Sequence, residues 1–74
     1  MPPSDLNAIR VFVQVAQVRG FAAAAQVLDM TPSGVSKAVG RLEKDLGAKL
    51  LHRTTRSVSL TTDGQSFLER CQNA

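Results

Sequence analysis

The chain has 74 residues, 43% hydrophobic and 20% charged, a composition that is typical of one small globular domain and excludes a disordered tail. Nine basic and six acidic residues give a net charge of +3, the lack of Trp and Tyr excludes a base-stacking aromatic surface, and a single cysteine excludes an internal disulfide. No apolar run approaches the roughly 18 residues of a membrane span and no signal-peptide pattern opens the chain, so we expect a soluble protein without a membrane partner.

The first predicted element is a helix with a cap at Ser4 and a stop at Gly20. Its inward face is predicted from apolar residues at helical spacing, with Phe12 beside them. These residues are Leu6, Ile9, Val13 and Ala16. Alternation at Val11, Val13 and Val15 also permits a strand, but the cap and the position of Phe12 favour a helix.

Two more helices are predicted on either side of an interruption at 29–31. The second helix begins at 21 or 22 and ends at Leu28, and its stripe comprises Phe21, Ala24, Ala25 and Leu28. The third helix spans 32–46, because Thr31 can cap it, Pro32 suits its first position and Gly47 ends it. Its apolar stripe comprises Val35, Val39, Leu42 and Leu46.

A hairpin and a fourth helix complete the prediction. The runs 50–54 and 57–61 carry β-branched residues, with Thr55 and Arg56 near the tip between them. Thr62 and Gln65 have the spacing of a capping box, although Thr61 could cap the fourth helix instead. This helix has Phe67, Leu68 and Cys71 on one face and no stop signal, so we expect the chain to be a piece of a longer protein.

The positive charge is concentrated in the third helix and the hairpin. Between residues 31 and 61, six cations and two acids give +4, whereas three cations and four acids elsewhere give −1. The six cations are Lys37, Arg41, Lys44, Lys49, Arg53 and Arg56. Two helices joined by a short turn and followed by a hairpin describe a helix-turn-helix with a wing.

The outward side of the third helix suits the major groove of DNA. Its first turn carries small polar residues that allow close approach and hydrogen bonds to base edges or phosphates. The outward residues are Thr31, Ser33, Gly34, Ser36, Lys37, Gly40, Arg41 and Lys44. Lys37 could reach a guanine edge or the backbone, while Arg53 and Arg56 could follow a phosphate strand or enter the minor groove.

Each of these features also has a simpler interpretation. A basic stripe is commonly a solvated face, and Arg53 and Arg56 could protect an edge strand from pairing. His52 is interpreted as a strand residue and not as a ligand, and Cys71 as an apolar residue on a helix. A winged helix could also bind an acidic protein partner. An enzyme is disfavoured, because no nucleophile with a base, paired acids or metal set occurs at a meaningful spacing.

The pattern resembles the N-terminal domain of LysR-type transcriptional regulators over nearly the whole chain. The residues that carry this resemblance are Phe21, Ala24, Ala25, Leu28, Val35, Ser36, Lys37, Val39, Arg41, Leu42, Glu43, Leu46, Gly47, Leu50, Leu51, Arg53, Leu60, Thr61 and Gly64. The resemblance implies a mainly α fold with a small β-hairpin, that is, a winged helix-turn-helix over 1–61. Residues 62–74 would begin a linker helix that pairs two subunits.

The resemblance also implies partners and site residues. Double-stranded DNA with a partly palindromic operator would be bound by a homodimer, tetrameric in the intact protein, in the cytoplasm at the nucleoid. No cofactor is expected in this chain, and a small-molecule effector would bind a C-terminal domain that is absent here. DNA contacts would come from Pro32, Ser33, Ser36 and Lys37, with Thr31 and Arg41 nearby, and from Arg53 and Arg56 on the wing. Many relatives have Gln in place of Pro32 and Arg in place of Lys37.

Overall fold

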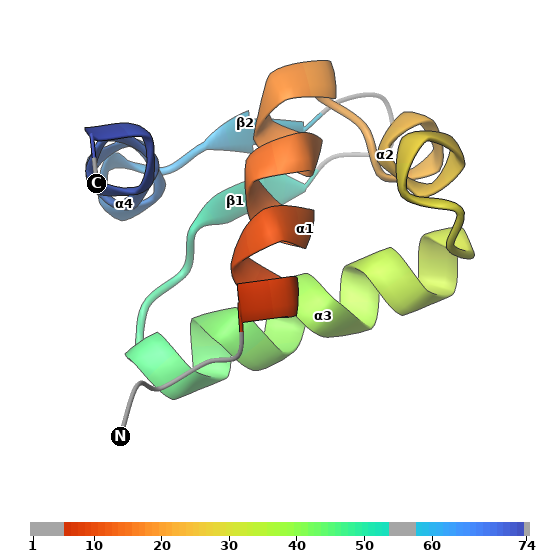
Figure 1. The fold of residues 1–74 in the computed structure, drawn as a ribbon. Coiled ribbons are helices and arrows are strands. Elements are labelled where there is room, and N and C mark those ends of the chain that lie inside the picture. Colours follow the sequence, from red (N-terminus) through yellow and green to blue (C-terminus); the bar gives the residue numbers. More distant parts are fainter. Residues whose placement is uncertain (1–5, 54–57, 74) are drawn as a thin grey trace.

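A computed structural model describes residues 6–53 and 58–73 of the chain. The elements in order are α1 (Leu6–Val18), α2 (Phe21–Leu28), α3 (Pro32–Leu46), β1 (Leu51–Arg53), β2 (Val58–Leu60) and α4 (Thr62–Asn73). In Figure 1, α1 crosses α3 in front of the hairpin, with α2 on one side and α4 on the other. The mainly α architecture with a small hairpin is confirmed. None of the helices in the described ranges is long and apolar enough to cross a bilayer.

The core lies where α1 packs against its neighbours. It is made of aliphatic residues and Phe12, whose ring meets that of Phe67 on α4 at 5.6 Å between centroids. Its buried members are Ala8, Val11, Phe12, Val15, Ala24, Ala25, Val35, Val39, Leu42, Leu50, Leu51, Val58 and Leu68. Every element in the described part of the chain contributes to this core, so the short helices and the hairpin stabilise one another.

The predicted inward face of α1 is wrong by part of a turn. Leu6 is 78% exposed, and Ile9, Val13 and Ala16 are only half-buried. The buried stripe is Ala8, Val11, Phe12 and Val15. Both stripes have helical spacing and lie side by side, because α1 touches α2 and α4 as well as α3. Which of them faces the core depends on the partners and not on the periodicity.

The stop of α1 also differs from the prediction. The helix ends at Val18, and Arg19 takes the left-handed conformation with φ 59°, donating its N–H to the Val15 carbonyl at 2.7 Å. Gly20 is extended and forms the N-cap of α2. Because only two residues lie between α1 and α2, the left-handed position falls on Arg19, at a cost of about 1 kcal/mol.

The boundaries of α2 and α3 are confirmed. After Leu28, Asp29 is left-handed with φ 57° and the Met30 N–H is donated to the Ala25 carbonyl at 2.8 Å. The Thr31 hydroxyl then caps α3 by accepting the Gly34 N–H at 3.0 Å. Pro32 occupies the first turn, and Gly47 ends the helix with φ 69°. The turn therefore holds the start of α3 in a fixed place against α2.

At its outer end the hairpin is one residue shorter than the predicted runs, because residues 50 and 61 lie outside the strands. Its antiparallel strands pair Leu51 with Leu60, His52 with Ser59 and Arg53 with Val58. The predicted tip at Thr55 and Arg56 lies outside the described residues, as does the predicted cap at Ser4.

Thr61, the alternative to the capping box at Thr62, caps the start of α4. Its hydroxyl accepts the Gly64 N–H at 2.9 Å and donates to the Lys49 carbonyl at 2.6 Å. The Thr61 N–H is donated to the Leu50 carbonyl at 3.1 Å. One residue therefore caps the helix and fastens it to the segment that leads into β1.

Candidate functional site

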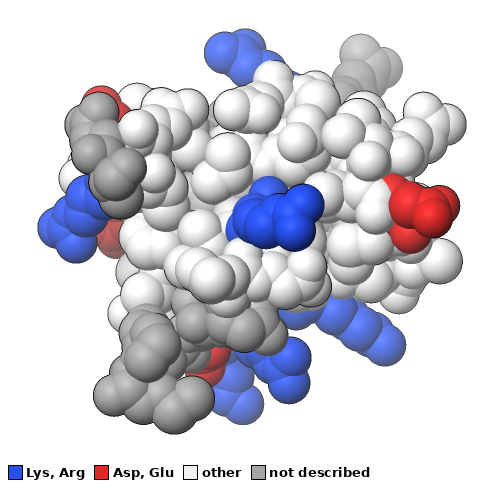
Figure 2. Space-filling model, in the orientation of Figure 1, with Lys and Arg blue, Asp and Glu red and all other residues white. Residues whose placement is uncertain are grey.

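The outer face of α3 carries most of the predicted site residues. Val35, Val39 and Leu42 turn to the core, so the opposite side of the helix faces solvent. The exposed residues there are Thr31, Pro32, Ser33, Lys37, Arg41 and Lys44, and Ser36 is half-buried at the edge of the face. Several basic groups project along the lower edge of Figure 2, on the side where α3 lies in Figure 1.

The three cations of this face are unpaired within the described part of the chain. Lys37, Arg41 and Lys44 form none of the ion pairs seen there, where the single pair joins Arg53 to Glu43. Nearer the start of the helix, the Thr31 hydroxyl is used as the cap, and Ser33 lies in the first turn, where backbone N–H groups have no carbonyl one turn earlier. The face therefore combines unpaired positive charge with small polar groups and an electropositive helix end.

Arg53 is held on three sides. Its Nη1 donates to the Ser36 hydroxyl at 2.9 Å, and its Nη2 lies 3.8 Å from Oε1 of Glu43. The guanidinium carbon lies 4.7 Å from the centroid of the Phe21 ring, within the range of a cation–π contact. One β1 side chain thus touches α2 and α3 together and joins the hairpin to both helices of the helix-turn-helix.

Glu43 is the buried acid beneath this contact. It is 7% exposed, and its Oε2 accepts the backbone N–H groups of Leu50 at 2.8 Å and Leu51 at 3.2 Å. The carboxylate satisfies two donors at the start of β1, which keeps its charge stable inside the fold. The sequence pattern did not predict this function of Glu43. Its place next to Leu42 and four residues after Val39, at the border of the apolar stripe, is the available signal.

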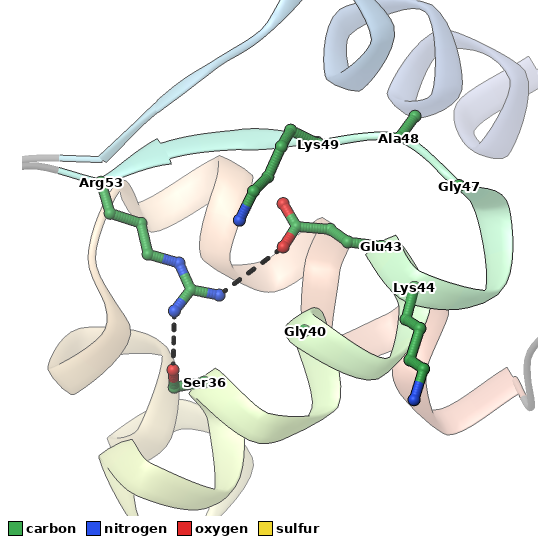
Figure 3. Close-up of a pocket in the computed structure, with 8 residues that line it drawn as sticks. All are labelled: Ser36, Gly40, Glu43, Lys44, Gly47, Ala48, Lys49 and Arg53. Carbon is green, nitrogen blue, oxygen red and sulfur yellow. Dashed lines mark hydrogen bonds and ion pairs between the residues drawn. The ribbon is translucent and has the colours of Figure 1, made fainter.

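An open groove of about 540 Å³ lies between α3 and the segment that enters β1. Its lining residues are Ser36, Gly40, Glu43, Lys44, Gly47, Ala48, Lys49 and Arg53. Figure 3 shows Lys49 and Arg53 reaching over the groove toward α3, and Gly40 leaves its wall bare. The groove combines cations from both sides with a buried carboxylate whose oxygens are already used.

The remaining predicted residues take different places. Arg56 lies outside the described residues. His52 is an exposed strand residue, as interpreted from the sequence. Cys71 is half-buried on α4, where burial raises the pKa of its thiol. Among the described residues, no group of three or more His, Cys, Asp or Glu side chains is arranged to hold a metal ion.

Comparison with known proteins gives concordant results at the level of sequence. Residues 6–65 match the profile described as bacterial regulatory helix-turn-helix protein, lysR family. The chain is 51% identical over 71 residues to the uncharacterized HTH-type transcriptional regulator y4mQ of Sinorhizobium fredii, covering 96% of this chain and 24% of that protein. It is 48% identical over 67 residues to the HTH-type transcriptional regulator DmlR of Escherichia coli, covering 90% of this chain and 22% of that protein. The chain spans about a quarter of the length of these curated relatives.

Solved structures share the same fold. The crystal structure of a CbnR_DBD–DNA complex superposes with a TM-score of 0.90 at 33% identity, covering 93% of this chain and 79% of that one. A BenM_DBD/catB site 1 DNA complex superposes with a TM-score of 0.88 at 32% identity, covering 93% of this chain and 77% of that one.

Proposed function

The chain belongs to the lysR family of bacterial regulatory helix-turn-helix proteins, and on this basis we propose that it binds double-stranded DNA with α3 in the major groove. The observation that carries the proposal is the outer face of α3, where Lys37, Arg41 and Lys44 are exposed and unpaired in the described part of the chain. Cations in this arrangement suit a phosphate backbone, and the DNA-bound structures of similar chains support the same partner.

The proposed contacts divide between base edges and phosphates. Pro32, Ser33 and Ser36 would lie against base edges at the start of α3, beside Thr31. Lys37 and Arg41 would bind phosphates or a guanine edge. The hairpin would supply its part of the interface through Arg56, while Arg53 lies against Ser36 on α3. Because Lys37 presents a point charge without the planar fork of arginine, it suits a phosphate better than bidentate base recognition.

In the whole protein, residues 1–61 would form the winged helix-turn-helix and residues from 62 onward the start of a linker helix. We propose a homodimer paired through that helix, tetrameric when intact, on a partly palindromic operator with half-sites about 34 Å apart or a multiple of that distance. The relatives are transcriptional regulators, so we propose regulation of transcription in the cytoplasm at the nucleoid, with a small-molecule effector bound by a further domain.

The test is the salt dependence of binding to a fluorescent duplex of random sequence, measured by anisotropy between about 50 and 200 mM salt. We expect log affinity to fall linearly with log salt concentration. Lys37→Ala should weaken binding and reduce the slope by roughly 0.9, the value of one phosphate contact. No binding at low salt, or binding that salt leaves unchanged, would contradict the proposal and favour a protein partner for this face.

A further inference from the structure

We propose that Arg53 is a positioning residue, which fixes the Ser36 hydroxyl so that this hydroxyl donates a hydrogen bond to an acceptor atom on DNA. This role rests on the proposed function. It changes the part that Arg53 plays in that function from contacting DNA to positioning Ser36. The sequence places Arg53 among the cations that would contact DNA themselves. The contacts of its guanidinium indicate that it acts through α3 instead.

The guanidinium of Arg53 has three contacts within the protein, although its side chain is 38% exposed. Nη1 donates to Ser36 at 2.9 Å, Nη2 faces Oε1 of Glu43 at 3.8 Å, and Phe21 lies 4.7 Å from the guanidinium carbon. A phosphate that approached the planar fork of Arg53 would compete with the Ser36 hydroxyl and the Glu43 carboxylate for the two terminal nitrogens. Lys37, Arg41 and Lys44 are exposed and have no such partners among the described residues, so they are better placed to meet phosphates.

Glu43 and Phe21 fix Arg53 in this position. The Glu43 carboxylate does not move freely, because Oε2 accepts the N–H groups of Leu50 and Leu51. Its other oxygen therefore offers a stationary negative charge beneath Arg53. Phe21 belongs to α2 and Glu43 to α3, so the guanidinium has a site built from two helices before any DNA is present.

The contact with Arg53 restricts the direction of the Ser36 hydroxyl. A serine hydroxyl has one hydrogen to donate and two lone pairs to accept. Arg53 occupies a lone pair at 2.9 Å, and within the described part of the chain this is the only hydrogen bond of the Ser36 side chain. The hydrogen is thus available for a partner outside the protein. Ser36 follows the exposed first turn of α3 and lies one residue before Lys37, so that partner is an oxygen or nitrogen acceptor on DNA.

The polarity of this bond has a consequence for recognition. Arg53 leaves the hydroxyl one hydrogen and one lone pair, and the positive guanidinium beside that oxygen favours acceptor atoms, such as guanine O6 and N7 or a phosphate oxygen, over the amino group of cytosine. A free serine hydroxyl can rotate to suit donor or acceptor. Arg53 would therefore narrow what Ser36 can recognise without itself touching the DNA.

The test is a double-mutant cycle on the 74-residue chain with Ser36→Ala, Arg53→Lys, Arg53→Gln and the Ser36 variant combined with Arg53→Lys. The probe is the tightest duplex selected by the wild-type chain from a randomised pool, with Arg10→Gln, at an exposed position of α1, as a matched control. We expect each single variant at 36 or 53 to lose about fivefold in affinity, and the double variant to lose no more than a single one. The salt slope should stay unchanged in all of them.

If the two losses of affinity were independent, the double variant would lose about 25-fold, and this result would overturn the positioning role. So would full affinity in Arg53→Lys, or a slope reduced by roughly 0.9 in Arg53→Gln, since either would show a direct phosphate contact. Thermal unfolding of each variant excludes loss of the fold, and Ser36→Ala and Arg53→Lys keep the cycle usable if Arg53→Gln does not fold. Selection from the pool with Ser36→Ala then identifies the acceptor: a changed preferred base indicates a base edge, and equal weakening on all sequences a phosphate. A wild-type chain that binds no duplex would instead overturn the proposed function.

Discussion

Two helical glycines differ in what surrounds them, and this difference predicts opposite effects of the same substitution. A Cβ at Gly64 would overlap the Leu50 carbonyl oxygen and lie 2.9 Å from its carbon, whereas a Cβ at Gly40 would meet nothing within 4 Å. Gly64→Ala should therefore destabilise the fold by about 1–3 kcal/mol, because α4 must move from Leu50. Gly40→Ala should stabilise it by about 0.5–1 kcal/mol through helix propensity.

Urea unfolding of the two variants measures both free energies, and each variant is the control for the other. Equal changes in the midpoint would show that the close approach of α4 to Leu50 does not constrain the fold.

Cys71 on α4 predicts a second effect at the residue scale. Burial raises the pKa of its thiol above the ordinary value of 9.0, so the folded chain holds less thiolate than the unfolded chain at a given mildly alkaline pH. Alkylation by iodoacetamide should be slower in the native chain than in urea. The corresponding stability is present below the ordinary pKa and is lost as the pH rises through the raised, folded-state pKa. Identical alkylation rates in the two states would contradict this burial.

At the scale of elements, Glu43 connects α3 to β1. Glu43→Ala would leave the Leu50 and Leu51 N–H groups without their acceptor and remove the acid that faces Arg53. We expect a loss of about 2–3 kcal/mol in the free energy of unfolding. Glu43→Gln, which keeps one oxygen for the two N–H groups, should lose less. The reverse order of the two variants in urea unfolding would show that the carboxylate is not the acceptor that holds β1.

The sequence predicts best those helix boundaries that are set by residues within or next to the helix itself. Thr31, Pro32 and Gly47 lie within or next to α3, and their effects on the backbone need no distant partner. The inward face of α1 was predicted wrongly, because three other helices decide which of two neighbouring stripes is buried. The capping choice between Thr61 and Thr62 stayed open for a similar reason, since the Lys49 carbonyl that accepts from Thr61 is twelve residues away.

The candidate site shows the same division. The exposed cations of α3 follow from helical periodicity once the apolar stripe is known. The contacts of Arg53 with Ser36, seventeen residues earlier, and of Glu43 with Leu50 and Leu51 depend on how β1 lies against α3. Periodicity carries no information about that placement, so the sequence predicts Arg53 as a cation that contacts DNA or protects an edge strand, and it predicts no contact for Glu43.

At the scale of the whole molecule, the position of a charge should matter more than the net charge. Arg41 and Arg10 are both exposed, but Arg41 lies on the outer face of α3 and Arg10 on α1. Arg41→Gln and Arg10→Gln change the net charge of +3 by the same amount. If α3 enters the major groove, only Arg41→Gln removes a charge that neutralises a phosphate.

Anisotropy titration of the two variants with the same random duplex checks this difference. Arg41→Gln should reduce the slope of log affinity against log salt concentration by roughly 0.9, and Arg10→Gln should leave it near the wild-type value. Each variant loses one positive charge and therefore the same part of the long-range attraction to DNA. This loss weakens binding equally in both variants, and it is small because attraction falls off over about 10 Å at 0.1 M salt. Equal slopes in the two variants would mean that attraction by net charge, and not a defined face of α3, brings this domain to DNA.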